Sequence, residues 1–277
     1  MLIPVRDVTY AVERAGAGIP VVLLHGFTGS SASWAEVSRA LAHGYDVIAI
    51  DALGHGDSSA PEDPCRYHAA EQVADLHAAL DRLGVTRAVV MGYSMGARLA
   101  LAFAVAYPSM VSALVLVSGG VGEREAADCA SRVLADDALA SAIERDGIQA
   151  FVERWERLPL WATQANADPS VLRRQREIRL RQRPAGLAGS LRGFGQGQEP
   201  SYWDDLAHLP MPVRLVVGAE DAKYVQRAND MASMIPDVQV VVLPGIGHGI
   251  PVEDPQALVR EVRAMVGDQL VEQARSM

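Results

Sequence analysis

Cysteine is nearly absent from this chain, and so is lysine. Cys65 and Cys129 are the only cysteines among 277 residues, and neither belongs to a CxxC motif or a Cys/His cluster. The sequence therefore predicts no disulfide framework and no metal site, and both thiols are interpreted as reduced and structural. Lysine occurs once, at Lys223. Apart from this residue, every side chain that is positively charged at neutral pH, with histidine taken as neutral, is an arginine.

Long apolar segments are also missing. No apolar run reaches the length that a bilayer span requires, and the first residues, 1–7, lack the pattern of a secretory signal. We therefore expect a cytoplasmic protein that does not insert into membranes. Hydrophobic residues make up 49% of the chain and charged residues 21%, which is ordinary for a globular domain with a sizeable core.

The net charge of −9 argues against a nucleic-acid partner. This charge is unevenly distributed, because residues 171–200 carry seven arginines and two acids, a local excess of +5 that leaves −14 for the remainder. Guanidinium groups bind carboxylate or phosphate through paired hydrogen bonds, so the cluster indicates an anionic ligand. For most of these arginines individually, a solvated helix face is the better interpretation.

Short apolar runs alternate with helical stretches along most of the chain. The expected strands are 21–24, 47–50, 88–91, 114–117, 214–217 and 238–243, and the clearest helices are 69–83 and 96–106. Continuous apolar runs of this length are typical of strands buried on both faces of a parallel sheet. The alternation predicts an α/β fold with a mostly parallel central sheet flanked by helices.

The alternation stops after Ser118 and resumes at Val213. Residues 122–200 are helical in composition and contain no convincing strand. We interpret them as a helical cap inserted into a core formed by residues 1–121 and 201–277. Ligands of α/β sheets bind at the carboxyl ends of the strands, and a cap in this position would cover those ends.

A Gly-x-Ser-x-Gly motif stands between an expected strand and an expected helix. Residues 88–91 form the strand, Gly92-Tyr93-Ser94-Met95-Gly96 the turn, and residues 97–104 the start of the helix. This context makes Ser94 a candidate nucleophile elbow, in which a sharp turn exposes the serine at the end of the sheet. The two glycines would remove Cβ atoms that otherwise collide with the neighbouring strand and helix.

A serine hydroxyl needs a histidine to accept its proton and an acid to orient that histidine. His248 lies in a Gly-rich loop directly after an apolar strand, which is a suitable position, whereas His208 is interpreted as a surface or packing residue. The adjacent carboxylates Glu220 and Asp221 end another strand and are the candidate acids. Ser94, acid and histidine then follow one another in that chain order.

Backbone amides are expected to complete the site as an oxyanion hole. One donor is the amide of Met95, the residue after the serine, and the other is that of Phe27, in the loop after the first buried strand. His25 in the same loop is interpreted as a brace rather than as a catalytic base. No cofactor is expected.

These motifs together resemble the α/β-hydrolase superfamily over nearly the whole chain. The resemblance rests on His25-Gly26, residues 54–58, the turn at Ser94, Gly218-Ala219-Glu220-Asp221 and Gly247-His248. The Gly-x-x-Asp turn of that superfamily selects Asp221 over Glu220. Residues 92–98, 151–160, 181–197 and 199–203 also resemble the 2-succinyl-6-hydroxy-2,4-cyclohexadiene-1-carboxylate synthases of menaquinone biosynthesis.

The second resemblance implies a lyase that eliminates pyruvate from a polycarboxylate cyclohexene, with Ser94 acting as a base. It also implies carboxylate contacts from Arg98 and Arg181 and a pocket lined by Tyr93 and Trp155. A further arginine early in the cap would be Arg124 or Arg132. The alternative function is a serine hydrolase, either a carboxylesterase or a carbon–carbon bond hydrolase, that uses the same three side chains.

Overall fold

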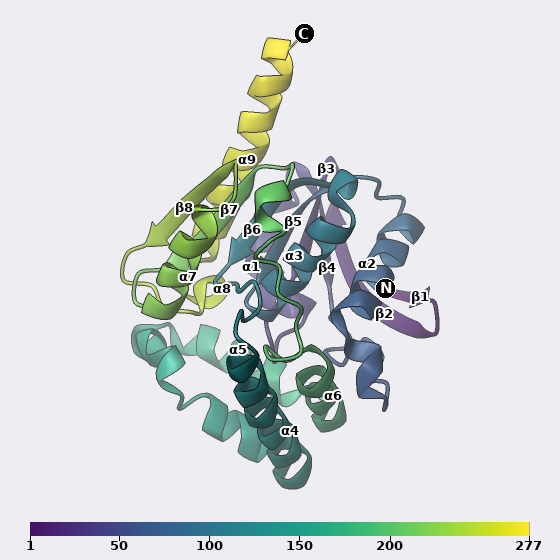
Figure 1. Ribbon diagram of the computed structural model, residues 1–277, viewed down its shortest axis with the longest axis vertical. Coiled ribbons are helices and arrows are strands. Elements are labelled where there is room, and N and C mark those ends of the chain that lie inside the picture. Colours follow the sequence, from purple (N-terminus) through teal and green to yellow (C-terminus); the bar gives the residue numbers. More distant parts are fainter. Residues whose placement is uncertain (277) are drawn as a thin grey trace.

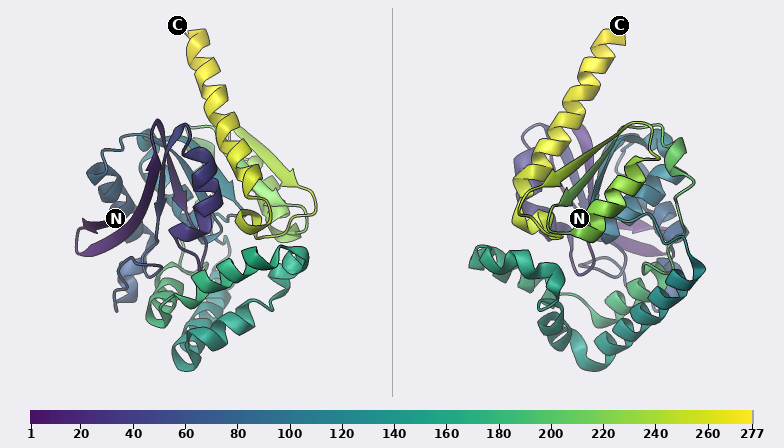
Figure 2. Two further views of the ribbon diagram at one scale, coloured as in Figure 1. Left: turned by 180° about the vertical axis from the view of Figure 1, so that it is seen from behind. Right: turned by 60° about the vertical axis from the view of Figure 1, so that its left-hand side comes forward.

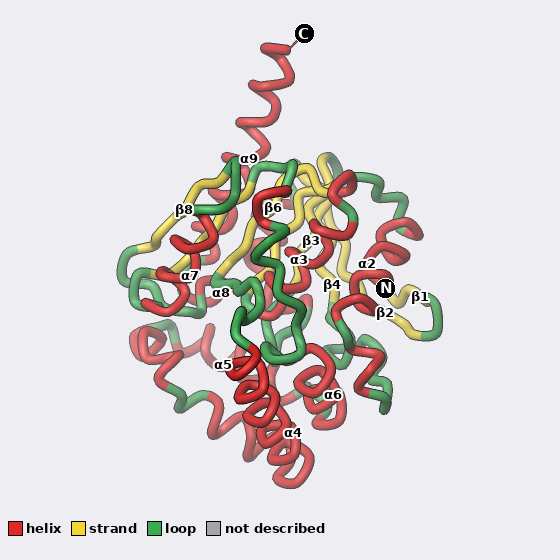
Figure 3. The backbone as a smooth tube through the Cα atoms, in the orientation of Figure 1, coloured by secondary structure: helices red, strands yellow, loops and turns green. Residues whose placement is uncertain are grey.

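A computed structural model describes the backbone of residues 1–276 and the side chains of all of these except Asn166 and 268–276. Its centre is an eight-stranded sheet in the order β1-β2-β4-β3-β5-β6-β7-β8 (Figures 1 and 3). The strands are β1 (Leu2–Val5), β2 (Val8–Gly16), β3 (Ile19–Leu24), β4 (Tyr45–Ile50), β5 (Ala88–Tyr93), β6 (Val111–Val117), β7 (Val213–Gly218) and β8 (Val238–Leu243).

The six expected strands are all present, and β3 to β8 pair in parallel through β4-β3-β5-β6-β7-β8. The prediction of a mostly parallel sheet is confirmed. The sequence analysis missed β1 and β2, which form an antiparallel hairpin that pairs with β4 at the edge of the sheet. The second half of β2 is exposed, so this strand lacks the continuous apolar run by which the other strands were found.

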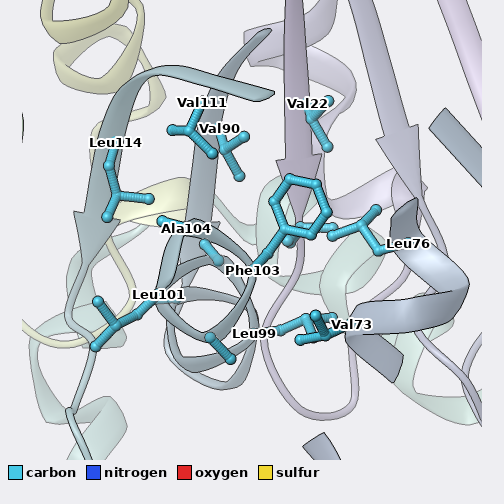
Figure 4. Packing of buried hydrophobic residues seen from close by; sticks show 14 of the residues in the cluster. Val22, Val73, Leu76, Val90, Leu99, Leu101, Phe103, Ala104, Val111 and Leu114 are labelled. Atoms are coloured by element: carbon cyan, nitrogen blue, oxygen red, sulfur yellow. The ribbon is translucent and has the colours of Figure 1, made fainter. Parts of the chain in front are cut away.

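Helices cover both faces of the sheet. On one face lie α2 (Ala69–Arg82), α3 (Met95–Ala106) and α7 (Ala222–Ala232), and on the other α1 (Ala35–Leu41) and α9 (Pro255–Ser276). Figure 4 shows Phe103 of α3 packed among Val22 and Val90 of the sheet and Leu76 of α2. Phe103 is fully buried, so α3 is held firmly behind the carboxyl end of β5.

A helical insertion between β6 and β7 forms the predicted cap. It contains α4 (Ala126–Trp155), a 3-10 segment η4 (Pro159–Asn166), α5 (Pro169–Leu180) and α6 (Pro184–Phe194). α4 is broken at Gly147, whose φ of 80° is readily available only to glycine. The cap has its own apolar cluster between α4 and α6, and it lies across one end of the sheet (Figure 2).

The remaining elements are short. They are α8 (Ile250–Glu253) and the 3-10 turns Ser31–Trp34, Pro64–Tyr67, Pro108–Met110 and Leu206–His208. Within the described part of the chain, no helix combines the length and the apolar character needed to cross a bilayer.

Candidate active site

Ser94 stands at the turn between β5 and α3 in a strained conformation. Its φ of 51° and ψ of −108° lie in a region that non-glycine residues rarely occupy. Its amide donates a hydrogen bond of 2.8 Å to the carbonyl of Val117 on β6, which helps to hold the turn. Strain of this kind persists only where the surroundings enforce it, and it exposes the serine hydroxyl beyond the end of the sheet.

Gly92 and Gly96 make this turn possible because neither position has room for a side chain. A Cβ atom on Gly92 would lie 2.1 Å from the carbonyl oxygen of Gly96, and one on Gly96 would lie 2.1 Å from that of Leu24 on β3. Both obstacles are backbone atoms that cannot rotate away. The predicted reason for the two glycines is confirmed.

His248 and Asp221 meet Ser94 from the ends of two other strands. His248 follows β8 and Asp221 follows β7, and the Nδ1 of His248 lies 2.6 Å from Oδ2 of Asp221. The Nε2 of His248 lies 3.0 Å from Oγ of Ser94. With Nδ1 donating to the carboxylate, Nε2 is free to accept the serine proton, a tautomer assigned from these contacts. Glu220 is exposed and makes no such contact.

Three aromatic rings surround the imidazole of His248. Ring centroids lie 4.8 Å away for Tyr224 of α7, 5.5 Å for Tyr93 of β5 and 5.9 Å for Trp161 of the cap. Burial raises the pKa of the Tyr93 and Tyr224 hydroxyls, so both phenols stay protonated near neutrality. The rings shield the His248–Asp221 pair from water, and His248 itself is 4% exposed.

The cap also packs directly onto the loop that carries His248. Gly247 and Gly249 flank this histidine, and the cap residues Thr163 and Gln164 occupy the space beside them. A Cβ atom on Gly247 would lie 2.3 Å from Oγ1 of Thr163, and one on Gly249 would lie 2.1 Å from Nε2 of Gln164. The absence of both Cβ atoms therefore lets η4 approach the histidine loop closely.

The predicted oxyanion donors are backbone amides of Phe27 and Met95. Among the described residues, neither amide has a hydrogen-bond acceptor. His25 braces the Phe27 loop, because its Nδ1 lies 2.8 Å from the Gly26 carbonyl oxygen and its Nε2 accepts the amide of Ala52 at 2.9 Å. Burial lowers the pKa of His25, which favours the neutral ring that this pattern requires.

A cavity of about 510 Å³ lies between the sheet and the cap, with Ser94 and His248 in its wall. Tyr93 and Trp155 line it, as the resemblance implied. Four donor atoms of cap side chains around it are buried and have no acceptor among the described residues: Trp155 Nε1, Trp161 Nε1, Gln164 Nε2 and Arg179 Nε. Unpaired buried donors are costly, so this wall favours a ligand rich in acceptor oxygens. No group of three or more His, Cys, Asp or Glu side chains in the described chain could hold a metal ion.

Arg98 lines the cavity from the first turns of α3, but it is already paired. Its Nη1 donates to Oε2 of Glu199 at 3.1 Å, and its Nη2 donates to the Phe194 carbonyl at 3.0 Å. The side chain of Glu199 is 1% exposed, and burial raises the pKa of its carboxyl although Arg98 lowers it. The remaining donors of Arg98 can still face the cavity.

The structure places Arg181, predicted as a substrate contact, away from the cavity wall. Arg181 is exposed at the end of α5 and does not line the cavity, whereas Arg179, two residues earlier, does. Arg179 is 5% exposed, donates to Glu156 at 3.2 Å, and lies 5.2 Å above the Trp161 ring. Side chains two positions apart on a helix differ by about 200° around the helix axis, so Arg181 points to solvent.

The two candidates for a further arginine, Arg124 and Arg132, lie at different places. Arg124 is exposed, stacks at 4.0 Å on Trp203, and lies in an outer groove rather than in the cavity. Arg132 of α4 lines the cavity and pairs with Asp136 at 3.0 Å. Arg124 is therefore not placed to contact a ligand beside Ser94.

Several cavity residues were not found from the sequence. Trp161, Gln164 and Tyr224 come near His248 only through the placement of the cap and of α7, for which the sequence offers no local signal. The one local signal for Arg179 is the adjacent apolar residue Ile178, which is buried in the structure. His208 is exposed, as interpreted.

Comparisons with known proteins agree with this architecture. Residues 19–255 match the family model described as alpha/beta hydrolase fold, and the chain belongs to that family. The predicted fold and superfamily are thereby confirmed.

Within the family, three relatives are informative. The chain is 40% identical over 251 residues to a Bacillus subtilis protein provisionally named as a 2-succinyl-6-hydroxy-2,4-cyclohexadiene-1-carboxylate synthase, covering 90% of this chain and 91% of the relative. It is 32% identical to the solved structure of MenH from S. aureus, with a TM-score of 0.89 and coverage of 94% and 98%. It is 28% identical over 265 residues to the 2-(acetamidomethylene)succinate hydrolase of Mesorhizobium japonicum, covering 94% and 92%.

Proposed function

We propose that this protein is a lyase that eliminates pyruvate from 2-succinyl-5-enolpyruvyl-6-hydroxy-3-cyclohexene-1-carboxylate. The product would be 2-succinyl-6-hydroxy-2,4-cyclohexadiene-1-carboxylate, an intermediate of menaquinone biosynthesis. The observation that carries the proposal is the cavity that combines Ser94 and His248 with cap side chains whose buried N–H groups have no acceptor among the described residues. The similarity to the synthase of Bacillus subtilis supports the same substrate.

The reaction begins with removal of a proton from the ring carbon next to the succinyl ketone. Oγ of Ser94 takes this proton as its own hydroxyl proton passes to Nε2 of His248, 3.0 Å away, and Asp221 stabilises the imidazolium that forms. The ketone becomes an enolate, and the amides of Phe27 and Met95 would donate hydrogen bonds to its oxygen.

Elimination follows from the enolate. Its electrons shift through the ring double bond and expel the enolpyruvyl oxygen from the ring carbon bonded to the far end of that double bond, which leaves the conjugated cyclohexadiene. The departing enolate accepts the proton from Nε2 of His248, and the resulting enol tautomerises to pyruvate; Ser94 keeps the proton taken from the ring carbon as its hydroxyl proton. No water is consumed and no acyl-enzyme forms, so Ser94 acts as a base rather than as a nucleophile.

A serine hydrolase is the second candidate. It is favoured by the same Ser94–His248–Asp221 geometry and by the similarity to the 2-(acetamidomethylene)succinate hydrolase. In that reaction Ser94 would attack a carbonyl or activate water, and the same amides would bind the tetrahedral oxyanion. The two candidates differ in whether water enters the product.

The test is to supply the enolpyruvyl substrate and follow pyruvate with lactate dehydrogenase, beside hydrolysis of p-nitrophenyl acetate. The proposal expects fast pyruvate release and slow ester hydrolysis. Ser94→Ala should lower pyruvate release by about 10²- to 10⁴-fold, the usual contribution of a positioned base. Ser201→Ala is the matched control and should leave the rate unchanged, because Ser201 is an exposed serine outside the cap. Fast ester turnover without pyruvate would refute the lyase.

A further inference from the structure

We propose that Lys223 binds a carboxylate of the substrate at the outer end of the cavity and thereby determines specificity for polyanionic ligands. This inference rests on the proposed function, since it names a further recognition residue of the same site. Lys223 is the single lysine of the chain and the second residue of α7. It lies two residues after Asp221, the partner of His248.

Lys223 occupies the junction of three hollows. It lines the cavity of Ser94, a small adjoining space of about 20 Å³ beside Arg98 and Glu199, and an outer surface groove of about 610 Å³. The side chain is exposed. Lys223 therefore lies where the cavity, the small space and the outer groove adjoin one another.

The other cations of the cavity wall are already neutralised by protein carboxylates. Arg98 pairs with Glu199 at 3.1 Å, Arg132 with Asp136 at 3.0 Å, and Arg179 with Glu156 at 3.2 Å. A ligand carboxylate that contacts any of these must share the guanidinium with a protein acid.

Lys223 differs from these arginines, because within the described residues it has no carboxylate partner. Its one specific contact is with the ring of Tyr224, whose centroid lies 5.8 Å from Nζ. An ammonium group provides three donors and a full charge on a flexible stem. Lys223 is thus the cation of this cavity whose charge is fully available to a ligand.

Because Lys223 is exposed, solvent and salt screen its charge, and its effect should be moderate. Lys223→Met keeps the apolar stem and removes the charge, and we expect it to raise the KM for the polycarboxylate substrate about three- to tenfold with little change in kcat. Lys223→Arg, which keeps the positive charge, should retain most of the affinity of the native protein for the polycarboxylate substrate. Hydrolysis of neutral p-nitrophenyl acetate should not change in either variant.

Arg87→Met is the matched control for loss of one positive charge. Arg87 is exposed just before β5, at the opposite end of the strand from Ser94. The Arg87→Met variant should leave KM unchanged. The KM of Lys223→Met should depend less on ionic strength than the KM of this control. An unchanged KM in Lys223→Met would overturn the inference. So would a loss of kcat alone, since that would indicate an effect on Asp221 instead.

Chemical protection supplies a measurement that does not require turnover. Lys223 is the single lysine of the chain, so acetylation of a lysine side chain by acetic anhydride reports on this residue alone. Propane-1,2,3-tricarboxylate should slow acetylation of Lys223 severalfold, and its trimethyl ester should not.

The outcomes separate the two proposals. Protection together with absence of pyruvate release would retain Lys223 as an anion site and refute the lyase. Pyruvate release with neither protection nor a KM effect would retain the lyase and refute the role of Lys223.

Discussion

Replacement of Arg98 by methionine should destabilise the protein by an amount that depends on pH. Arg98 and Glu199 form a buried pair, with side chains 9% and 1% exposed. Methionine keeps the apolar stem against Phe194, whose ring lies 4.7 Å from the guanidinium carbon, but it removes both hydrogen bonds of Arg98. Glu199 is then left as a buried carboxyl without its cation.

The sign of the pH dependence follows from the pKa of Glu199. Burial raises this pKa and Arg98 opposes the rise, so the variant should hold a still higher pKa in the folded state. The folded variant then keeps a proton that the unfolded chain loses at a pKa of about 4.3. The contribution that protonated Glu199 makes to the stability of the variant is fully present below that value, and it is lost as the pH rises through the pKa of Glu199 in the folded state.

The magnitude depends on the state of the carboxyl. Breaking a buried ion pair costs about 3–5 kcal/mol when the remaining group stays charged. At pH 5 the folded variant can protonate Glu199, and the loss falls toward the cost of missing hydrogen bonds, about 1–3 kcal/mol. The destabilisation should therefore be about 2 kcal/mol larger at pH 8 than at pH 5.

Equilibrium urea unfolding, followed by tryptophan fluorescence at both pH values, measures this difference. The double variant Arg98→Met/Glu199→Gln is the control, because the glutamine cannot ionise and the added pH dependence should disappear. Equal destabilisation of Arg98→Met at the two pH values would refute the reasoning.

Two further predictions concern the cap and the serine turn. Arg179→Met should raise the KM of the lyase substrate about tenfold, whereas Arg181→Met, at an exposed position, should change it by less than about twofold; equal effects would contradict the positions described. Gly96→Ala should destabilise the fold by about 3 kcal/mol, because its Cβ would meet the Leu24 carbonyl at 2.1 Å. Gly44→Ala, with open space around its Cβ, should cost less than about 1 kcal/mol in the same urea titration.

The sequence predicted the parts of the fold whose signal is local. Parallel strands buried on both faces leave continuous apolar runs, so β3 to β7 were found, whereas the half-exposed β2 was not. β8 was found by the same kind of apolar run, although this edge strand is only partly buried. Ser94 and His248 were found because each lies in a Gly-rich turn directly after such a run. Their meeting in space then follows from the parallel sheet, which brings the strand ends to one edge.

Side-chain direction in the cap was harder to predict. The α5 region carries an arginine at nearly every other position, so the cluster alone does not show which one faces the cavity. The sequence did not single out Arg179, which lines the cavity, because only its position around the helix, next to the buried Ile178, distinguishes it from Arg181. Trp161 reaches His248 through the packing of the whole insertion, and no stretch of adjacent residues encodes that approach.

The contact between η4 and the histidine loop bears on how such proteins diversify. Thr163 and Gln164 fill space that exists only because Gly247 and Gly249 lack side chains. The insertion and the loop are thus sterically matched, although some 80 residues separate them in the chain. A chimaera that takes a cap from a relative must take the residues around its histidine as well. New substrate ranges would then arise by paired exchange of cap and loop rather than by replacement of the cap alone.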